Sequence, residues 1–203
     1  MVKMKVIEFF GMPRAGKTEQ INKLSLYLKE KGISHLIITD REVEKEIDVP
    51  LESAFEYNML FFSKIFEKLL FAKQNKKHKI VILDRGFLDA EAWFSVEHEQ
   101  KRLSDHEKRT AEKYLEPLRN NIDVGILLLV DPKVTRARHE SKGETGKADD
   151  YVLGSYLEEL YREYLRLKDK FRNDSRVLIL DGNETSEELH SKIKDKLQKE
   201  GVL

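Results

Sequence analysis

The sequence predicts an α/β fold in which a five-stranded parallel sheet carries helices on both faces. Five short apolar runs are rich in leucine and β-branched residues and lack strict alternation, which is typical of strands buried on both faces. Amphipathic helical patterns separate these runs, and such alternation favours a doubly wound sheet with right-handed crossovers. A glycine-spaced segment follows the first run, at the carboxyl edge where ligands of these sheets bind.

The expected strands cover residues 6–10, 35–39, 80–83, 124–130 and 177–180. Apolar residues at helical spacing predict a first helix over residues 18–31, which ends at Gly32. A second clear helical pattern covers residues 154–171. Strands and helices therefore follow one another along most of the chain.

Three further helices are expected to begin at Ser53, Ser104 and Thr185. Each of these residues is followed three positions later by glutamate, which is the pattern of a capping box. Residues 40–51 and 141–150 are poor in core signals. We expect both stretches to be mobile loops beside the carboxyl edge of the sheet.

Length and composition restrict the class of protein. With 203 residues, the chain is long enough for one domain with a full core, and we expect a single domain over residues 1–203. The 37 basic and 37 acidic side chains balance, so charge does not favour nucleic acid or a membrane surface as a partner. The absence of cysteine excludes disulfides, thiolate nucleophiles and cysteine-ligated zinc. Charged residues interrupt the most apolar stretch, 55–72, so we expect no membrane span and a cytoplasmic location.

Residues 11–18 match the phosphate-binding pattern G-x-x-x-x-G-K-[ST] between an expected strand and an expected helix. Glycines let main-chain N–H groups point at phosphate oxygens, and the helix adds its positive end. Lys17 is expected to reach the β- and γ-phosphates of a nucleotide, and Thr18 to bind Mg²⁺ through its hydroxyl. The alternative to a phosphate site is an ordinary surface loop in which Lys17 is solvated. The expected cradle consists of Gly11, Met12, Pro13, Arg14, Ala15, Gly16, Lys17 and Thr18.

The third expected strand ends in Asp84. In a fold with such a phosphate loop, this aspartate lies beside the loop and can hold the metal, usually through water. The alternative is an aspartate that caps the next helix. We therefore expect Asp84 and Thr18 to form the Mg²⁺ site.

The loop GMPRAGKT, the Asp84-Arg85-Gly86 turn and the Asp131-Pro132 turn together resemble the thymidylate kinase group. These are nucleoside monophosphate kinases of the P-loop class, close in fold to the deoxynucleoside kinases. The resemblance extends over most of the chain and implies a three-layer P-loop NTPase sandwich with a lid. It also implies ATP and Mg²⁺ as cofactors and a nucleoside monophosphate as acceptor. The first candidate acceptor is dTMP. A homodimer is compatible with it.

The resemblance also implies roles for individual residues. Arg14, inside the loop, would meet the γ-phosphoryl group during transfer and act with Lys17 and Asp84 in catalysis. Arg85, and Arg41 after the second strand, would bind the acceptor's phosphate, as guanidinium forks suit phosphate oxygens. A lid over about residues 133–152 would close over ATP and exclude water, with Arg136 held toward the donor. The alternative for Arg41 and Arg85 is an ion pair at a strand end.

Asp89 is expected one helical turn before Trp93 on the same helix face. It would bind a sugar hydroxyl or a base edge of the acceptor, or it would be a first-turn acid favoured by the helix dipole. The acceptor-side region would also include about residues 40–75. Four aromatic residues at helical spacing are expected to be mostly core, with one of them available for stacking on a base. They are Phe55, Tyr57, Phe61 and Phe62.

The chain departs from the family where acids are usual: Phe10 and Pro13 occupy those places. Glu8 lies on the same side of its strand as Phe10, and is either a partial substitute for a base or a buried carboxylate paired with a base. A hydroxyl acceptor needs a general base more than a phosphate does. The missing acids therefore favour a monophosphate acceptor. A deoxynucleoside kinase using Glu8 or Asp89, and a nucleotide-dependent switch without an acceptor, are the alternatives.

Overall fold

The structure is a computed structural model and describes residues 4–48, 53–141 and 156–203. Its strands are all parallel and lie in the order β2-β3-β1-β4-β5, which confirms the predicted five-stranded sheet. The strands are β1 (Lys5–Gly11), β2 (His35–Thr39), β3 (Ile80–Asp84), β4 (Val124–Leu129) and β5 (Val177–Asp181). The helices are α1 (Lys17–Glu30), α2 (Asp40–Lys45), α3 (Ala54–Asn75), α4 (Ala90–Glu99), α5 (Asp105–Arg119), α6 (Pro132–Glu140), α8 (Tyr156–Phe171) and α9 (Ser186–Lys199).

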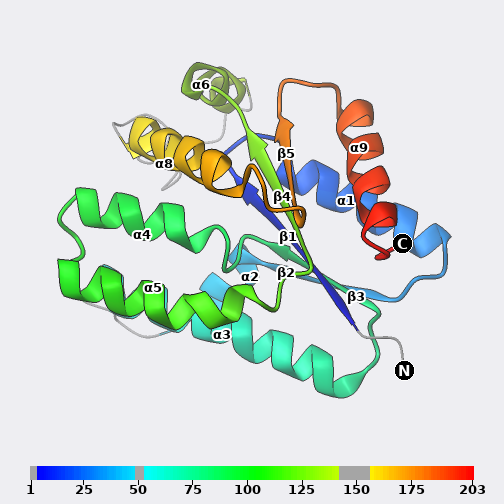
Figure 1. The fold of residues 1–203 in the computed structure, drawn as a ribbon, viewed down its shortest axis with the longest axis horizontal. Helices are drawn as coiled ribbons and strands as arrows, with labels where there is room; N and C mark the ends of the chain where they lie inside the picture. Colours follow the sequence, from blue (N-terminus) through cyan, green and yellow to red (C-terminus); the bar gives the residue numbers. More distant parts are fainter. Residues whose placement is uncertain (1–3, 49–52, 142–155) are drawn as a thin grey trace.

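Helices cover both faces of the sheet, which gives three layers (Figure 1). On one face α1 packs against α9, and on the other α4 packs against α5 and α8, with α3 beside α5. The central strand β1 has β3 on one side and β4 on the other. The chain order therefore reverses at β1, and in open α/β sheets the crevice beyond such a strand is where ligands bind.

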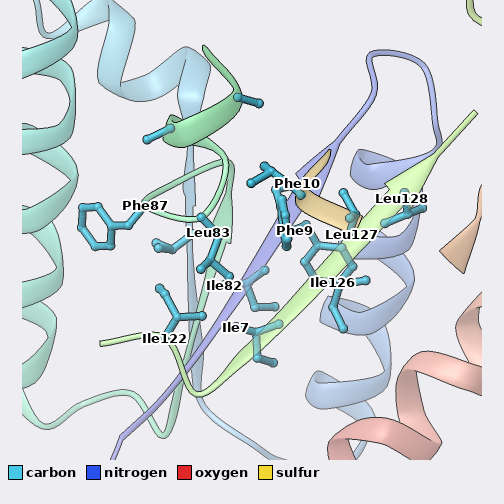
Figure 2. Packing of buried hydrophobic residues seen from close by; sticks show 14 of the residues in the cluster. Ile7, Phe9, Phe10, Ile82, Leu83, Phe87, Ile122, Ile126, Leu127 and Leu128 are labelled. Atoms are coloured by element: carbon cyan, nitrogen blue, oxygen red, sulfur yellow. The ribbon is translucent and has the colours of Figure 1, made fainter. Parts of the chain in front are cut away.

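The sheet forms the centre of the hydrophobic core. On β1, Ile7 is in register with Ile82 of β3, and Phe9 with Ile126 of β4; Figure 2 shows these side chains together. Residues 6–11 are all buried, which explains why the apolar runs of the sequence do not alternate. This packing holds the carboxyl end of β1, and hence the loop that follows it, in a fixed position.

The predicted helix starts are confirmed. The side-chain oxygens of Ser53, Ser104 and Thr185 each accept a hydrogen bond from the main-chain N–H three residues later. The predicted helix 18–31 is α1, displaced by one residue at each end.

The expected loop over residues 40–51 is wrong in its first half, because α2 begins at Asp40. Thr39 caps this helix through a capping box with Glu42, and Val43 is buried beneath it. The Thr-x-x-Glu spacing was present in the sequence, but a single buried residue gave the segment no visible periodicity. The second expected loop, 141–150, lies outside the described residues after Ser141.

None of the helices in the part of the chain that the structure describes is long and apolar enough to cross a bilayer.

Candidate active site

The phosphate loop begins where β1 ends, and its first residues are anchored on β4. Gly11 has a φ of 117°, and a Cβ built on it would lie 2.1 Å from the carbonyl oxygen of Leu128, so only glycine fits at this position. The next amide, of Met12, donates a 3.0 Å hydrogen bond to the same oxygen. Residue 17 already belongs to α1, so the positive end of that helix faces the loop.

Lys17 lies over the phosphate loop and is bonded to its main chain. Its Nζ donates to the carbonyl oxygens of Gly11 and Met12 at 2.9 Å each, and the residue is 7% exposed. Burial lowers the pKa of Lys17 to about 8, and the neighbouring Arg85 acts in the same direction. An anion beside Lys17 would stabilise its charged form, so this environment favours a phosphate ligand.

Thr18 and Asp84 lie together, as the sequence predicted. The Thr18 hydroxyl donates to a carboxylate oxygen of Asp84 at 3.3 Å. Burial raises the pKa of Asp84, while Lys17 opposes that shift. A hydroxyl and one carboxylate are oxygen ligands that fit Mg²⁺, which takes its remaining ligands from substrate phosphates and water. Among the described residues no cluster of three or more metal-ligating side chains occurs.

Arg85 is shared between two carboxylates across from the phosphate loop. Its Nε lies 3.6 Å from Asp40 Oδ2 and 3.8 Å from Asp89 Oδ2, and its guanidinium lies 4.8 Å from the ring centre of Trp93. Burial by itself would lower the pKa of Arg85, but the neighbouring acids, led by Asp89, raise it. The guanidinium therefore stays charged. The alternative expected from the sequence, an ion pair of Arg85 at a strand end, is present in this structure. Arg85 still lies near the loop, because its main-chain N–H donates to Phe9 of β1.

Asp89 connects three segments of the chain. One carboxylate oxygen accepts the Gly11 N–H at 3.2 Å and the Tyr164 hydroxyl at 2.6 Å, and the other accepts Trp93 Nε1–H at 2.7 Å. The expected proximity of Asp89 and Trp93 is confirmed. The residue is 1% exposed, and its side chain makes no capping bond to α4. Asp89 thus links the phosphate loop to α4 and to α8.

Glu8 is fully buried beneath the turn that carries Arg85. Its carboxylate accepts the main-chain N–H groups of Leu88 and Asp89, at 2.8 and 2.9 Å. Burial raises the pKa of Glu8 to about 8, and Arg119 contributes only a weaker opposing attraction. The sequence alternative of a buried carboxylate is realised, with main-chain amides in place of a basic partner. Glu8 therefore supports the turn from below.

The other three arginines that the sequence singled out lie on the loop itself, on α6 and on α2. Arg14 Nη2 is 3.2 Å from His139 Nδ1 on α6. Arg136, also on α6, pairs with Glu158 of α8 at 2.9 Å. Arg41 lies in the first turn of α2 with an exposed side chain. The predicted lid starts with α6, and its residues 142–152 lie outside the described part of the chain.

The aromatic residues of α3 behave mainly as core. Phe61 and Phe62 are buried, and Phe55 is partly buried against the core. Tyr57 stacks on Phe61 with ring centres 6.2 Å apart. The expectation that most of this stripe is core is confirmed.

Sequence reasoning missed two residues beside the site. Asp40 directly follows β2 and faces Arg85, and its position between a strand and Arg41 was the available signal. Tyr164 meets Asp89 from a helix 75 positions further along the chain, and no local pattern indicates such a contact.

A parallel sheet with a phosphate loop after its central strand, and with Thr18 and Asp84 in contact beside that loop, defines a P-loop kinase fold. The family model for thymidylate kinase matches residues 9–193. The chain belongs to the thymidylate kinase family, and its general chemistry is phosphoryl transfer to a nucleotide or nucleoside.

Solved structures of similar fold support the same class. Deoxyadenosine kinase from M. mycoides with bound dATP superposes with a TM-score of 0.66 at 18% sequence identity, covering 95% of this chain and 99% of that chain. The same kinase with bound dCTP gives a TM-score of 0.59 at 19% identity, covering 96% and 99%. At such identity the likeness is one of fold. A comparison with curated protein sequences found no match.

Proposed function

We propose that this protein transfers the γ-phosphoryl group of ATP to a nucleoside monophosphate, with dTMP as the first candidate. The observation that carries the proposal is that two cations lie at the carboxyl ends of neighbouring strands. The buried Lys17 follows the phosphate loop after β1, and the partly buried Arg85 follows β3, where its main-chain N–H donates to the Phe9 carbonyl of β1 at 2.9 Å. An anion between them would be stabilised by both.

The residues around this point supply most of what the transfer needs. Lys17 would exchange its two carbonyl partners for phosphate oxygens of the donor. Arg14 would add a positive charge near the γ-phosphoryl group, over which negative charge spreads during transfer. When bound at Thr18 and Asp84, Mg²⁺ would neutralise the donor phosphates. On the acceptor side, Arg85 would hold the phosphate of the acceptor, because its planar fork matches phosphate oxygens.

Other predicted residues have supporting roles in this proposal. Arg41 would reach the acceptor phosphate from α2, and Arg136 would turn from Glu158 toward the donor when the lid closes. Asp89 would act on the acceptor and would also orient Arg85 through their 3.8 Å approach. The expected cytoplasmic location remains part of the proposal, and a homodimer is compatible with it.

A nucleoside kinase is the second candidate, and Asp40 favours it. This carboxylate lies 3.6 Å from Arg85 at the carboxyl edge of the sheet. It could accept the proton of a sugar hydroxyl as a general base. Glu8 and Asp89, the bases named from the sequence, are 0% and 1% exposed, whereas the Asp40 side chain is 26% exposed. The structural neighbours are deoxyadenosine kinases, which agrees with this candidate at the level of fold.

A panel of acceptors separates the candidates. The purified protein is incubated with γ-labelled ATP, Mg²⁺ and one nucleoside or nucleoside monophosphate at a time, and the labelled products are separated by chromatography. We expect a labelled nucleoside diphosphate, most strongly from dTMP. Labelled monophosphates formed from nucleosides would select the second candidate. Free phosphate without any labelled acceptor would overturn both and indicate a nucleotide-dependent switch.

A further inference from the structure

One face of α6 contacts the phosphate loop from outside. Thr135, Arg138 and His139 are spaced i, i+3 and i+4, so they share that face. The Thr135 hydroxyl donates to the carbonyl oxygen of Pro13 at 3.1 Å. Arg138 Nη1 donates to the carbonyl oxygen of Arg14 at 3.0 Å, and His139 Nδ1 lies 3.2 Å from the Arg14 guanidinium. Two successive carbonyls of the loop are thus bound by one helix.

Arg138 also binds a third segment. Its Nη2 donates to the carbonyl oxygen of Gly182 at 2.9 Å, in the turn after β5. That turn lies tightly against the loop, because a Cβ on Gly182 would approach the carbonyl oxygen of Ala15 to 2.8 Å. A guanidinium presents its N–H groups in a rigid planar fork. Arg138 can therefore fix two carbonyls relative to each other, which an ammonium cannot do with the same geometry.

The direction of these carbonyls decides the direction of the amides that bind phosphate. In a trans peptide the C=O and the following N–H are coplanar and point in opposite directions. When Arg138 holds the Arg14 carbonyl outside the loop, the Ala15 N–H points inward. The Ala15 N–H donates a 3.3 Å hydrogen bond to the Met12 carbonyl oxygen, which also accepts a hydrogen bond from Lys17 Nζ. Thr135 orients the Arg14 N–H in the same way.

The loop needs this support at Arg14. Arg14 has a φ of 59°, a left-handed conformation that a non-glycine residue adopts only when its surroundings stabilise it. Without a partner for its carbonyl, the peptide between residues 14 and 15 could rotate, and its N–H would leave the inner side of the loop. The contacts with α6 oppose that rotation.

We propose that Arg138 is a positioning residue that holds the phosphate loop in its nucleotide-binding conformation from outside. It acts through the Arg14 and Gly182 carbonyls. Arg136, two residues earlier, pairs with Glu158 on α8 and belongs to a different side of the helix. The inference rests on the proposed use of ATP at this loop, and it is independent of the acceptor.

The test compares Arg138→Ala and Arg138→Lys with the control Lys29→Ala, an exposed residue in the last turn of α1. The Kd for ATP in the presence of Mg²⁺ is measured by isothermal titration well below the melting temperature, which is recorded for every variant. Loss of two hydrogen bonds from a charged donor predicts a Kd at least about tenfold higher for Arg138→Ala. Arg138→Lys should recover only part of this loss, and Lys29→Ala should bind as the wild type does.

Two results would overturn the proposal. One is a lower melting temperature for Arg138→Ala with an unchanged Kd, since that is the signature of a purely structural residue. The other is full recovery of the wild-type Kd by Arg138→Lys, which would show that simultaneous binding of the Arg14 and Gly182 carbonyls by a planar guanidinium is not required. A wild type that binds ATP but phosphorylates no acceptor would overturn the proposed function and leave this inference standing. A wild type that binds no ATP would overturn both.

Discussion

The proposed donor and acceptor sides of the site lie at the same edge of the sheet but are built differently. On the donor side, main-chain groups determine the geometry: Gly11 fits against β4, Met12 binds Leu128, and Arg138 holds loop carbonyls. On the acceptor side, charged side chains determine it, with Arg85 between Asp40 and Asp89 at distances of 3.6 and 3.8 Å.

This difference has a physical consequence for what each side can recognise. Main-chain amides in a closed loop present a fixed set of donors to any polyphosphate, whatever nucleoside is attached. A shared guanidinium depends on which charges surround it, so its preference changes with a single neighbouring side chain. We therefore expect donor binding to be insensitive to acceptor-side variants, and acceptor choice to be sensitive to them.

The largest expected effect is on the donor side. Replacing Lys17 by alanine removes the cation that is buried against the loop and that would neutralise the transferred group. We expect kcat/KM to fall by about a thousandfold or more, comparable to the loss of a preorganised charge-stabilising group in other enzymes. The measurement is steady-state kinetics with the acceptor found in the panel. Lys29→Ala, an exposed change in the last turn of α1, serves as the control and should keep full activity.

A smaller effect with a different signature is expected for Arg85→Ala. With a phosphate-bearing acceptor, the acceptor KM should rise about ten- to a hundredfold because a charge-assisted hydrogen bond is lost, while the Kd for ATP changes little. Arg85→Lys keeps the charge but loses the planar fork, and should lie in between. An equal loss of ATP affinity would break the comparison, because it would show that the two sides are not separable.

The sequence allowed the donor side to be predicted well. The spacing from Gly11 to Thr18 depends on neighbours along the chain, and so does the strand that ends in Asp84. The contact between Thr18 and Asp84 followed once both were placed at the carboxyl edge of one sheet. Local patterns were sufficient because each part of this geometry is specified within a few residues.

The acceptor side was predicted less completely. Arg85 follows β3, its partners Asp40 and Asp89 lie at the start of α2 and just before α4, and Tyr164 reaches Asp89 from α8. Contacts between such distant segments depend on strand order and helix packing, which periodicity does not reveal. The same holds for Arg138, whose two carbonyl partners are 124 positions before it and 44 positions after it.

The smallest expected effect is the one that distinguishes the two acceptor classes, and it comes from Asp40→Asn. If the acceptor carries a phosphate, Asp40 competes with that phosphate for Arg85. Removing the charge should then lower the acceptor KM by about a few-fold and leave kcat nearly unchanged, since like charges no longer meet. The control is Asp195→Asn, an exposed change on α9.

If the acceptor is instead a nucleoside hydroxyl, the sign of the effect reverses. Asp40 would then take the proton of the attacking hydroxyl, and its loss should lower kcat by about a hundredfold or more. Asparagine has nearly the same shape as aspartate, so the two outcomes differ through charge and basicity rather than through packing. A single substitution at the end of β2 thus reports whether Arg85 serves to bind an acceptor phosphate or to hold a base in place.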